Sequence, residues 1–144
     1  MGLLMQRCIV VLCLLFTLPG YAVTELLVVS AKGSKIELSR QQIKQLYLGA
    51  RLSVDGVNLK PLVLPVGNRW RMVFNTKVMG LSEARIQSYW AQMKFTGRRE
   101  EPNEVESVKS LTEALLNEAG SLGYLPKEQI DLNRFHVIYR IQVE

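Results

Sequence analysis

Short apolar runs that suit β-strands alternate along this chain with stretches in which apolar residues recur at helical spacing. The strand-like runs are residues 26–29, 59–65, 122–125 and 135–143. The helix-like stretches are residues 39–49, 69–78, 82–93 and 104–118. Strands that alternate with helices need crossover connections. The alternation therefore predicts an α/β fold, with a small mixed or mostly parallel sheet covered by helices.

Local signals set several of these boundaries. Ser39-Arg-Gln-Gln42 has the form of a capping box, and Gly49 suits the end of the helix that this box opens. Asp55-Gly56 predicts a tight turn before the second strand. In the last strand the apolar residues alternate, which predicts that they share one side. These residues are Phe135, Val137, Tyr139, Ile141 and Val143.

The N-terminus has the three parts of a secretory signal peptide. Arg7 precedes an apolar run from Cys8 to Leu18 that only Thr17 interrupts, and Gly20 and Ala22 stand where signal cleavage needs small residues. The alternative is a membrane anchor, but this run is about half of the ~20 residues that a spanning helix needs. We expect cleavage after Ala22, a single domain over residues 23–144, a periplasmic location and no stable membrane insertion after cleavage.

Charge and composition narrow the function classes. The chain has a formal charge of +5, and loss of Arg7 with the signal leaves the remainder mildly basic. Outside the cytoplasm such a surface suits small oxyanions, acidic polymers or lipid headgroups, and we expect no nucleic-acid partner. An ordinary solvated surface with a modest excess of charge explains the same composition.

Catalytic and metal-binding residues are scarce. Both cysteines, Cys8 and Cys13, lie in the signal, and His136 is the single histidine. One imidazole without cysteine does not form a common nitrogen and sulfur metal site, and no Gly-x-Ser-x-Gly motif accompanies it. We therefore expect no enzyme activity, no metal and no cofactor, and we interpret His136 as packed on or beside the sheet.

The strongest candidate site lies where the second strand meets the next helix. Pro65-Val-Gly-Asn68 leads directly into Arg69, so free backbone N–H groups and the positive end of a helix meet there. The predicted ligand-binding residues are Gly67, Asn68, Arg69 and Arg71, with an oxyanion as the ligand. Arg98-Arg99 is a second candidate. Alternatively, these arginines are solvated and the glycines only shape turns.

Aromatic residues recur at helical spacing in two places, Trp70 with Phe74 and Tyr89-Trp90 with Phe95. Such stripes usually belong to the core, and we expect that here. A surface for a partner is the alternative.

Four segments in the same order resemble the phosphate-binding proteins of phosphate ABC transporters. They are Leu38-Ser-Arg-Gln-Gln-Ile-Lys-Gln-Leu-Tyr-Leu-Gly49, Leu64-Pro-Val-Gly-Asn-Arg-Trp-Arg-Met-Val-Phe74, Tyr89-Trp90 with Phe95-Thr-Gly97, and Gly120-Ser-Leu-Gly-Tyr124. The resemblance implies one lobe of a type 2 periplasmic binding protein, with phosphate or another oxyanion as ligand in connection with ABC-type uptake.

The chain departs from that family in two respects. The family's complete binders have two lobes, whereas residues 23–144 suffice for about one. The family's turn presents a serine-glycine-threonine hydroxyl set, whereas Gly67-Asn68-Arg69 carries no hydroxyl. A second hypothesis follows, in which the domain is a protein-interaction or sensory accessory module of the cell envelope that has lost ligand binding.

Overall fold

A computed structural model describes residues 24–143 of the chain. The predicted signal peptide, residues 1–22, lies outside the described residues. Within residues 24–143, no helix combines the length and the apolar character that a membrane span requires.

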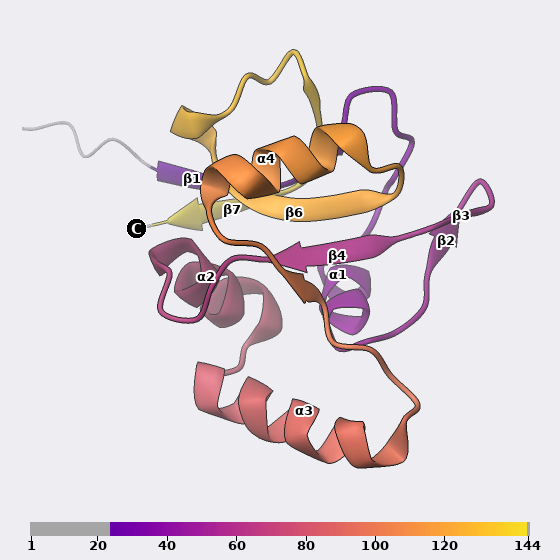
Figure 1. Cartoon of the computed structure of the whole chain (residues 1–144). Coiled ribbons are helices and arrows are strands. Elements are labelled where there is room, and N and C mark those ends of the chain that lie inside the picture. The colour runs from indigo at the N-terminus through magenta and orange to yellow at the C-terminus, as the bar shows by residue number, and fades with distance from the viewer. Residues whose placement is uncertain (1–23, 144) are drawn as a thin grey trace, which may run out of the picture.

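One five-stranded sheet organises the domain (Figure 1). Its strands are β1 (Thr24–Ala31), β4 (Lys60–Val63), β5 (Asn103–Glu104), β6 (Ser121–Pro126) and β7 (Phe135–Val143), in the order β5-β4-β6-β1-β7. β4 pairs in parallel with β5 and β6, whereas β1 pairs antiparallel with β6 and β7. The predicted α/β class is confirmed, and the sheet takes the mixed form.

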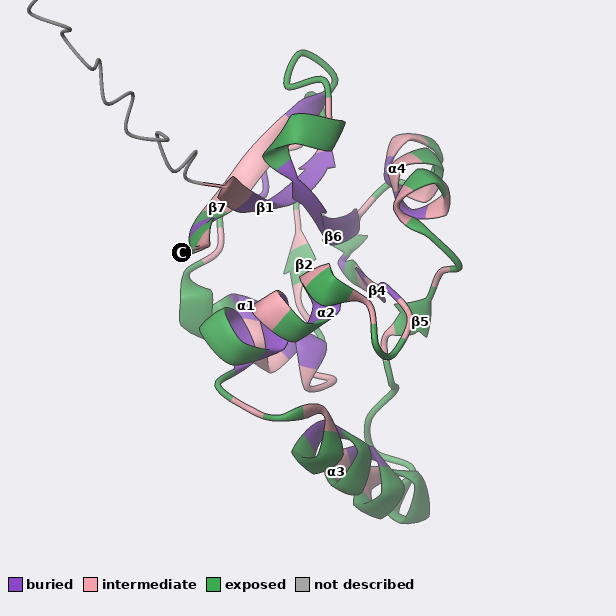
Figure 2. Ribbon diagram, turned by 90° about the vertical axis from the view of Figure 1, so that its left-hand side faces the viewer, coloured by how far each residue is buried: buried purple, intermediate pink, exposed green. Residues whose placement is uncertain are grey.

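Helices cover both faces of this sheet. Figure 2 shows α4 (Val108–Asn117) on one side and α1 (Arg40–Tyr47) with α2 (Arg69–Phe74) on the other. The two central strands are accordingly buried, from Leu26 to Ser30 in β1 and throughout β6. Strands covered on both faces carry continuous apolar runs, which explains why these segments do not alternate.

The first helix and the turn at Asp55-Gly56 form as predicted, and the turn joins two short strands that were not predicted. The Ser39 hydroxyl accepts a hydrogen bond from the Gln42 backbone, and the Gln42 side chain accepts one from the Ser39 backbone, so the capping box is present. The strands β2 (Ser53–Val54) and β3 (Val57–Asn58) pair around Asp55 and Gly56, whose φ angles are +50° and +77°. Two positive φ angles in succession are the mark of a type I′ hairpin turn.

Two predicted helix boundaries are wrong. The stretch 104–118 becomes helical only at Val108, because Ser107 caps the helix and Asn103–Glu104 joins the sheet as β5. The stretch 69–78 divides into α2 and a π-helical turn, η1 (Asn75–Met79), which ends at Gly80. Hydrogen bonding to the neighbouring strand and a local change of helix type are both invisible to apolar periodicity.

The last strand also departs from the prediction. β7 pairs Tyr139 with Val28 but Val137 with Val29, so Ile138 is an extra residue in a β-bulge. The bulge interrupts the alternation that the sequence shows between Phe135 and Val143. The expected single apolar side is therefore not continuous.

The aromatic stripes divide between core and surface. Phe74 and Trp90 are buried, as expected, but Phe95 is 94% exposed, so its assignment to the core is wrong. Phe95 lies in the last turn of α3 (Glu83–Thr96), which projects beyond the sheet in Figure 1. No layer covers that end of the helix. A short 3-10 turn, η2 (Lys127–Gln129), completes the elements.

Candidate functional site

The predicted site lies at the junction between β4 and α2. Residues 64–68 leave the carboxyl end of β4 and enter the helix through Asn68, with Gly67 at a φ of +88°. β4, β5 and β6 are parallel, so their carboxyl ends meet at this same edge of the sheet. Open α/β sheets bind ligands at such an edge.

Asn68 uses its side chain inside the junction. Its Oδ1 accepts hydrogen bonds from the Trp70 nitrogen at 2.8 Å and from the Arg71 nitrogen at 3.4 Å. The side chain is therefore an N-cap. It occupies the backbone N–H groups of Trp70 and Arg71, which would otherwise be free to donate to an anion at the helix end.

Arg69 points away from the core. The side chain is exposed, and its guanidinium carbon lies 4.8 Å from the centroid of the Trp70 ring. A cation held over an indole in this way is stabilised by the charge distribution of the ring. Arg69 is thus the predicted site residue whose charge faces solvent.

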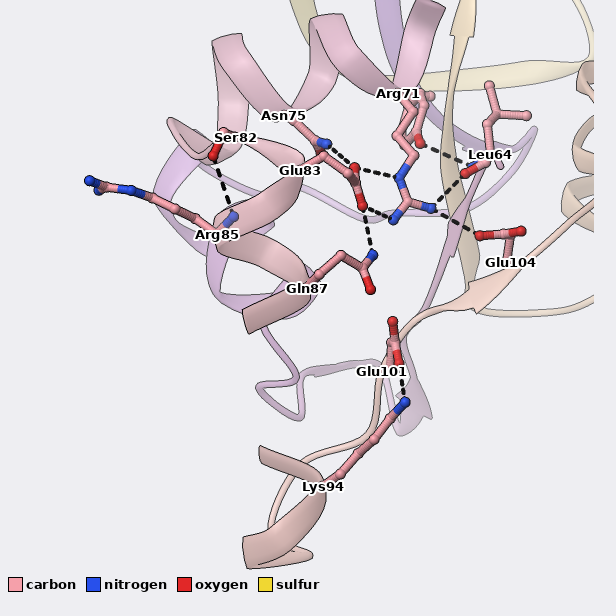
Figure 3. Close-up of polar contacts among 11 residues, drawn as sticks. Leu64, Arg71, Asn75, Ser82, Glu83, Arg85, Gln87, Lys94, Glu101 and Glu104 are labelled. Carbon is pink, nitrogen blue, oxygen red and sulfur yellow. Dashed lines mark hydrogen bonds and ion pairs between the residues drawn. The ribbon is translucent and has the colours of Figure 1, made fainter. Parts of the chain in front are cut away.

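Arg71 does the opposite, because it is 5% exposed and turns into the protein. Its Nε and Nη2 donate to the two carboxylate oxygens of Glu83 at 3.0 and 2.7 Å. Its Nη1 donates to the Leu64 carbonyl at 2.8 Å and to Glu104 at 3.1 Å (Figure 3). One guanidinium therefore joins α2, α3, β5 and the residue that follows β4.

Glu83 is held by further donors. The Asn75 side chain donates to its Oε2 and the Gln87 side chain to its Oε1, each at 2.7 Å. Burial alone would raise the pKa of Glu83, but the hydrogen bonds from Arg71 and Gln87 hold the pKa below its usual value. Burial likewise opposes the charge on Arg71, and the hydrogen bonds to Glu83 raise its pKa above the usual value. Both groups are ionised, and with Glu104 the cluster holds two carboxylates for one guanidinium.

Aromatic side chains pack next to this cluster, and Tyr47 and Phe74 line the same small cavity as Arg71. Phe74 stacks on Tyr124 with a centroid distance of 4.3 Å, and Tyr47 packs against Phe74 at 4.6 Å. The Tyr124 hydroxyl accepts from the Leu64 nitrogen, and the Tyr47 hydroxyl donates to the Leu62 carbonyl, each at 3.0 Å. Burial raises the pKa of both phenols, so both stay neutral. The two phenols therefore hold the end of β4 in place through neutral hydrogen bonds.

Solved structures supply the comparison that sequence searches do not. Neither a scan with family models nor a search of curated proteins finds a match. Among solved structures, an ABC-type phosphate transport receptor from Vibrio cholerae matches 81% of this chain with a TM-score of 0.61 and 14% identity. Over the matched residues this chain has the same α/β fold as part of that receptor.

A second solved structure agrees. A putative phosphate ABC transporter substrate-binding protein with bound phosphate, from Clostridium perfringens, matches 81% of the chain with a TM-score of 0.61 and 12% identity. The chain spans 46% of the Vibrio cholerae receptor and 44% of the Clostridium perfringens protein, which is less than half of each. The resemblance inferred from the four sequence segments is confirmed at the level of the fold.

In the second predicted candidate, Arg98-Arg99, the side chain of Arg99 makes contacts within the chain. Arg99 donates from Nη1 to the Leu48 carbonyl at 2.9 Å and to the Tyr89 hydroxyl at 3.1 Å, so it ties the loop after α3 to the end of α1. His136 is half-buried, and its Nε2 lies 2.9 Å from the Ile36 carbonyl oxygen, as expected for a histidine beside the sheet. Within residues 24–143, no group of acidic, histidine or cysteine side chains is arranged to hold a metal ion.

Sequence reasoning missed the two acidic partners of Arg71. These partners are Glu83 and Glu104. The available signal was the position of Glu83, directly after the cap Ser82, where an acidic residue suits the helix end. That position says nothing about a partner twelve residues away in the chain.

Proposed function

We propose that this chain is a non-catalytic periplasmic binding module that has the phosphate-receptor fold and recognises an envelope protein through the β4–α2 junction. The observation that carries the proposal is the pairing of Arg71 with Glu83 and Glu104. The chain's own carboxylates occupy the guanidinium that an oxyanion would need.

The charge balance supports this choice. An oxyanion that reached Arg71 would approach two carboxylates, which lie 2.7 and 3.1 Å from the guanidinium. An anion on the same guanidinium would lie close to both carboxylates, and like charges repel. Even if the anion displaced Glu104, the bidentate pairing of Glu83 would remain. Binding of a small anion at Arg71 would therefore oppose the existing network.

The outer surface of the junction has the composition of a protein contact. We call Val66, Arg69, Trp70 and Met72 the junction face. Val66 and Met72 are 56% and 58% exposed. Met72 follows Arg69 by three residues, so Arg69 and Met72 lie on the same side of α2. Tryptophan, methionine and arginine are enriched at the centres of protein interfaces.

Photo-crosslinking in cells tests the junction face. A photoreactive residue at Met72 should give a discrete covalent product with one envelope protein, and Arg69→Glu should reduce that product. The matched control is a photoreactive residue at Leu132, which is also an exposed apolar position but lies in the loop before β7. Absence of a product at Met72, or the same product at both positions, would contradict the proposal.

The second candidate function is oxyanion binding at Gly67, Asn68, Arg69 and Arg71 in connection with ABC-type uptake. It is favoured by the exposed guanidinium of Arg69 and by the open space around Gly67, where an added Cβ would meet no atom within 4 Å. The phosphate named with the Clostridium perfringens structure points to the same ligand class.

Calorimetric titration with phosphate, and with sulfate as the second anion, separates the two candidates. Micromolar binding, about −8 kcal/mol, that Arg69→Ala removes would establish the oxyanion site. No heat with either anion would exclude the oxyanion site and favour the junction face as a protein-binding surface. Arg69→Ala is the informative variant, because Arg71→Ala would also break the internal ion pairs.

A further inference from the structure

A pocket lies at the edge of the sheet opposite to the junction. Ser121 at the start of β6 pairs with Lys60 at the start of β4, and Ser30 near the end of β1 pairs with Leu122. Both pairs therefore belong to the edge where β4 begins. The pocket has a volume of about 340 Å³ and lies between the end of β1, residues 33–36, the β2–β3 hairpin and the loop before β6. In Figure 1 the β2–β3 hairpin marks this side of the molecule. We call it the hairpin pocket.

The walls of the hairpin pocket are largely apolar. Ile36, Val54, Val57 and Leu59 contribute side chains from three different segments. Small-molecule sites are typically apolar cavities of roughly 300–1,000 Å³ with a few placed polar groups. The volume and the lining both fall within that description.

A buried hydroxyl in the lining lacks a partner. Ser121 is 1% exposed, and among the described side chains its Oγ is the buried polar atom for which no hydrogen-bond partner is found. Ser30, also in the lining and 1% exposed, has its hydroxyl paired with that of Ser34. An unsatisfied buried hydroxyl is costly, and a water or a ligand in the pocket would supply the missing hydrogen-bond partner.

Charged side chains complete the lining. Asp55, Glu118 and Lys35 are exposed residues of the pocket, and none of them forms an ion pair with another described residue. Two carboxylates against one ammonium group favour a cation. The groups that would orient a ligand are therefore a hydroxyl and two carboxylates around an apolar body.

We propose that the hairpin pocket binds a small organic ammonium compound with an apolar body and a hydrogen-bonding tip. The apolar body packs against Ile36, Val57 and Leu59. The ammonium group pairs with Asp55 and Glu118, and the tip bonds to the Ser121 hydroxyl. The proposal is independent of the junction face, which lies at the other end of β4.

Two matched probes test the pocket. Leucinamide carries an apolar side chain, an ammonium group and an amide, and 4-methylpentanamide is the same molecule without the ammonium group. Each is titrated into the ¹⁵N-labelled protein while backbone amide shifts are followed. Leucinamide should give saturable shifts confined to residues 30–36, 54–59 and 118–121. The neutral amide should bind about fivefold more weakly, as loss of an exposed ion pair predicts.

Variants separate the pocket from nonspecific attraction. Asp55→Asn combined with Glu118→Gln should weaken leucinamide to about the level of the neutral amide. Glu113→Gln, an exposed carboxylate of α4 outside the hairpin pocket, should leave the affinity unchanged. Ser121→Ala should weaken both probes while leaving the unfolding midpoint unchanged or higher.

Three results would overturn the proposal. They are no saturable shift up to about 10 mM leucinamide, equal affinities for the two probes, or unchanged binding by the Asp55→Asn, Glu118→Gln variant. Shifts centred on residues 64–72 would place the compound at the junction instead, and would equally reject the hairpin pocket.

Discussion

Buried polar groups are paired differently at the two ends of β4, the β4–α2 junction and the hairpin pocket. At the β4–α2 junction the buried Arg71 meets Glu83, Glu104 and the Leu64 carbonyl, so its hydrogen-bonding capacity is largely used inside the chain. At the hairpin pocket the buried Ser121 hydroxyl has no partner. At the end of the sheet that resembles a ligand site by its sequence, the chain's own groups pair with the arginine, whereas the opposite end, which has no recognisable motif, retains a buried hydroxyl without a partner.

The difference shows that a sequence motif can identify a position in a fold without showing that a ligand site is available there. An arginine after a strand and a glycine can hold a ligand or can hold the fold together. Its neighbours in space decide between the two. Mutations that separate structural from binding roles at each edge therefore test the comparison directly.

The largest expected effect is at Arg71. Arg71→Ala removes one partner of a buried network and leaves two carboxylates unpaired, which should lower the free energy of unfolding by about 3–5 kcal/mol. Urea denaturation measures this. Arg69→Ala, at an exposed position, should stay within about 0.5–1 kcal/mol of the unmodified protein. Equal stabilities for the two variants would remove the structural role assigned to Arg71.

The next effect is at Gly120, which closes one side of the hairpin pocket. An added Cβ would lie 2.4 Å from the Asn58 carbonyl oxygen at a φ of +82°, so Gly120→Ala should cost about 2–3 kcal/mol.

Gly33→Ala is the matched control for Gly120→Ala. Gly33 has a φ of +89° but no atom within 4 Å of an added Cβ, so the substitution should cost about 1–2 kcal/mol from backbone strain alone. Urea midpoints compare the two variants. If Gly120→Ala cost no more than Gly33→Ala, the contact between the loop before β6 and the hairpin would be unimportant.

Acid should weaken the junction. The folded state holds the pKa of Glu83 below its ordinary value of 4.5, so this stabilising contribution is present above pH 4.5 and is lost as pH falls through the folded pKa. The hydrogen bond from Lys127 lowers the pKa of Glu25 in the same direction. Glu83→Gln should therefore be less stable at neutral pH but lose less stability in acid. Urea denaturation at a series of pH values measures how the free energy of unfolding changes with pH in the unmodified protein and in Glu83→Gln. The same pH dependence in both proteins would contradict the prediction.

The smallest effect is expected at Ser121. Its hydroxyl has no partner to lose, so Ser121→Ala should change the free energy of unfolding by less than about 0.5 kcal/mol or raise it. Tyr47→Phe is the control, because it leaves the buried Leu62 carbonyl without its phenol donor and should cost about 1–2 kcal/mol. A large loss in Ser121→Ala would show that the hydroxyl has an internal partner after all.

The sequence by itself determined the local features of the fold. The capping box at Ser39, the turn at Asp55-Gly56 and the buried runs of β1 and β6 follow from interactions within a few residues or from continuous apolar composition. The order of strands and helices was enough to predict the α/β class. The order of four segments was enough to predict a fold like one lobe of a phosphate-binding protein, and the likeness to part of two solved structures confirms it at the level of the fold.

Tertiary structure alone decided what the predicted site contains. Arg71 meets Glu83 twelve residues later and Glu104 thirty-three residues later, and neither spacing has a local signature. The bulge at Ile138 and the exposure of Phe95 likewise depend on which element lies opposite. Pairings between distant residues are fixed by the packing of whole layers, because a side chain's partner is set by where its element docks and not by its neighbours in the chain.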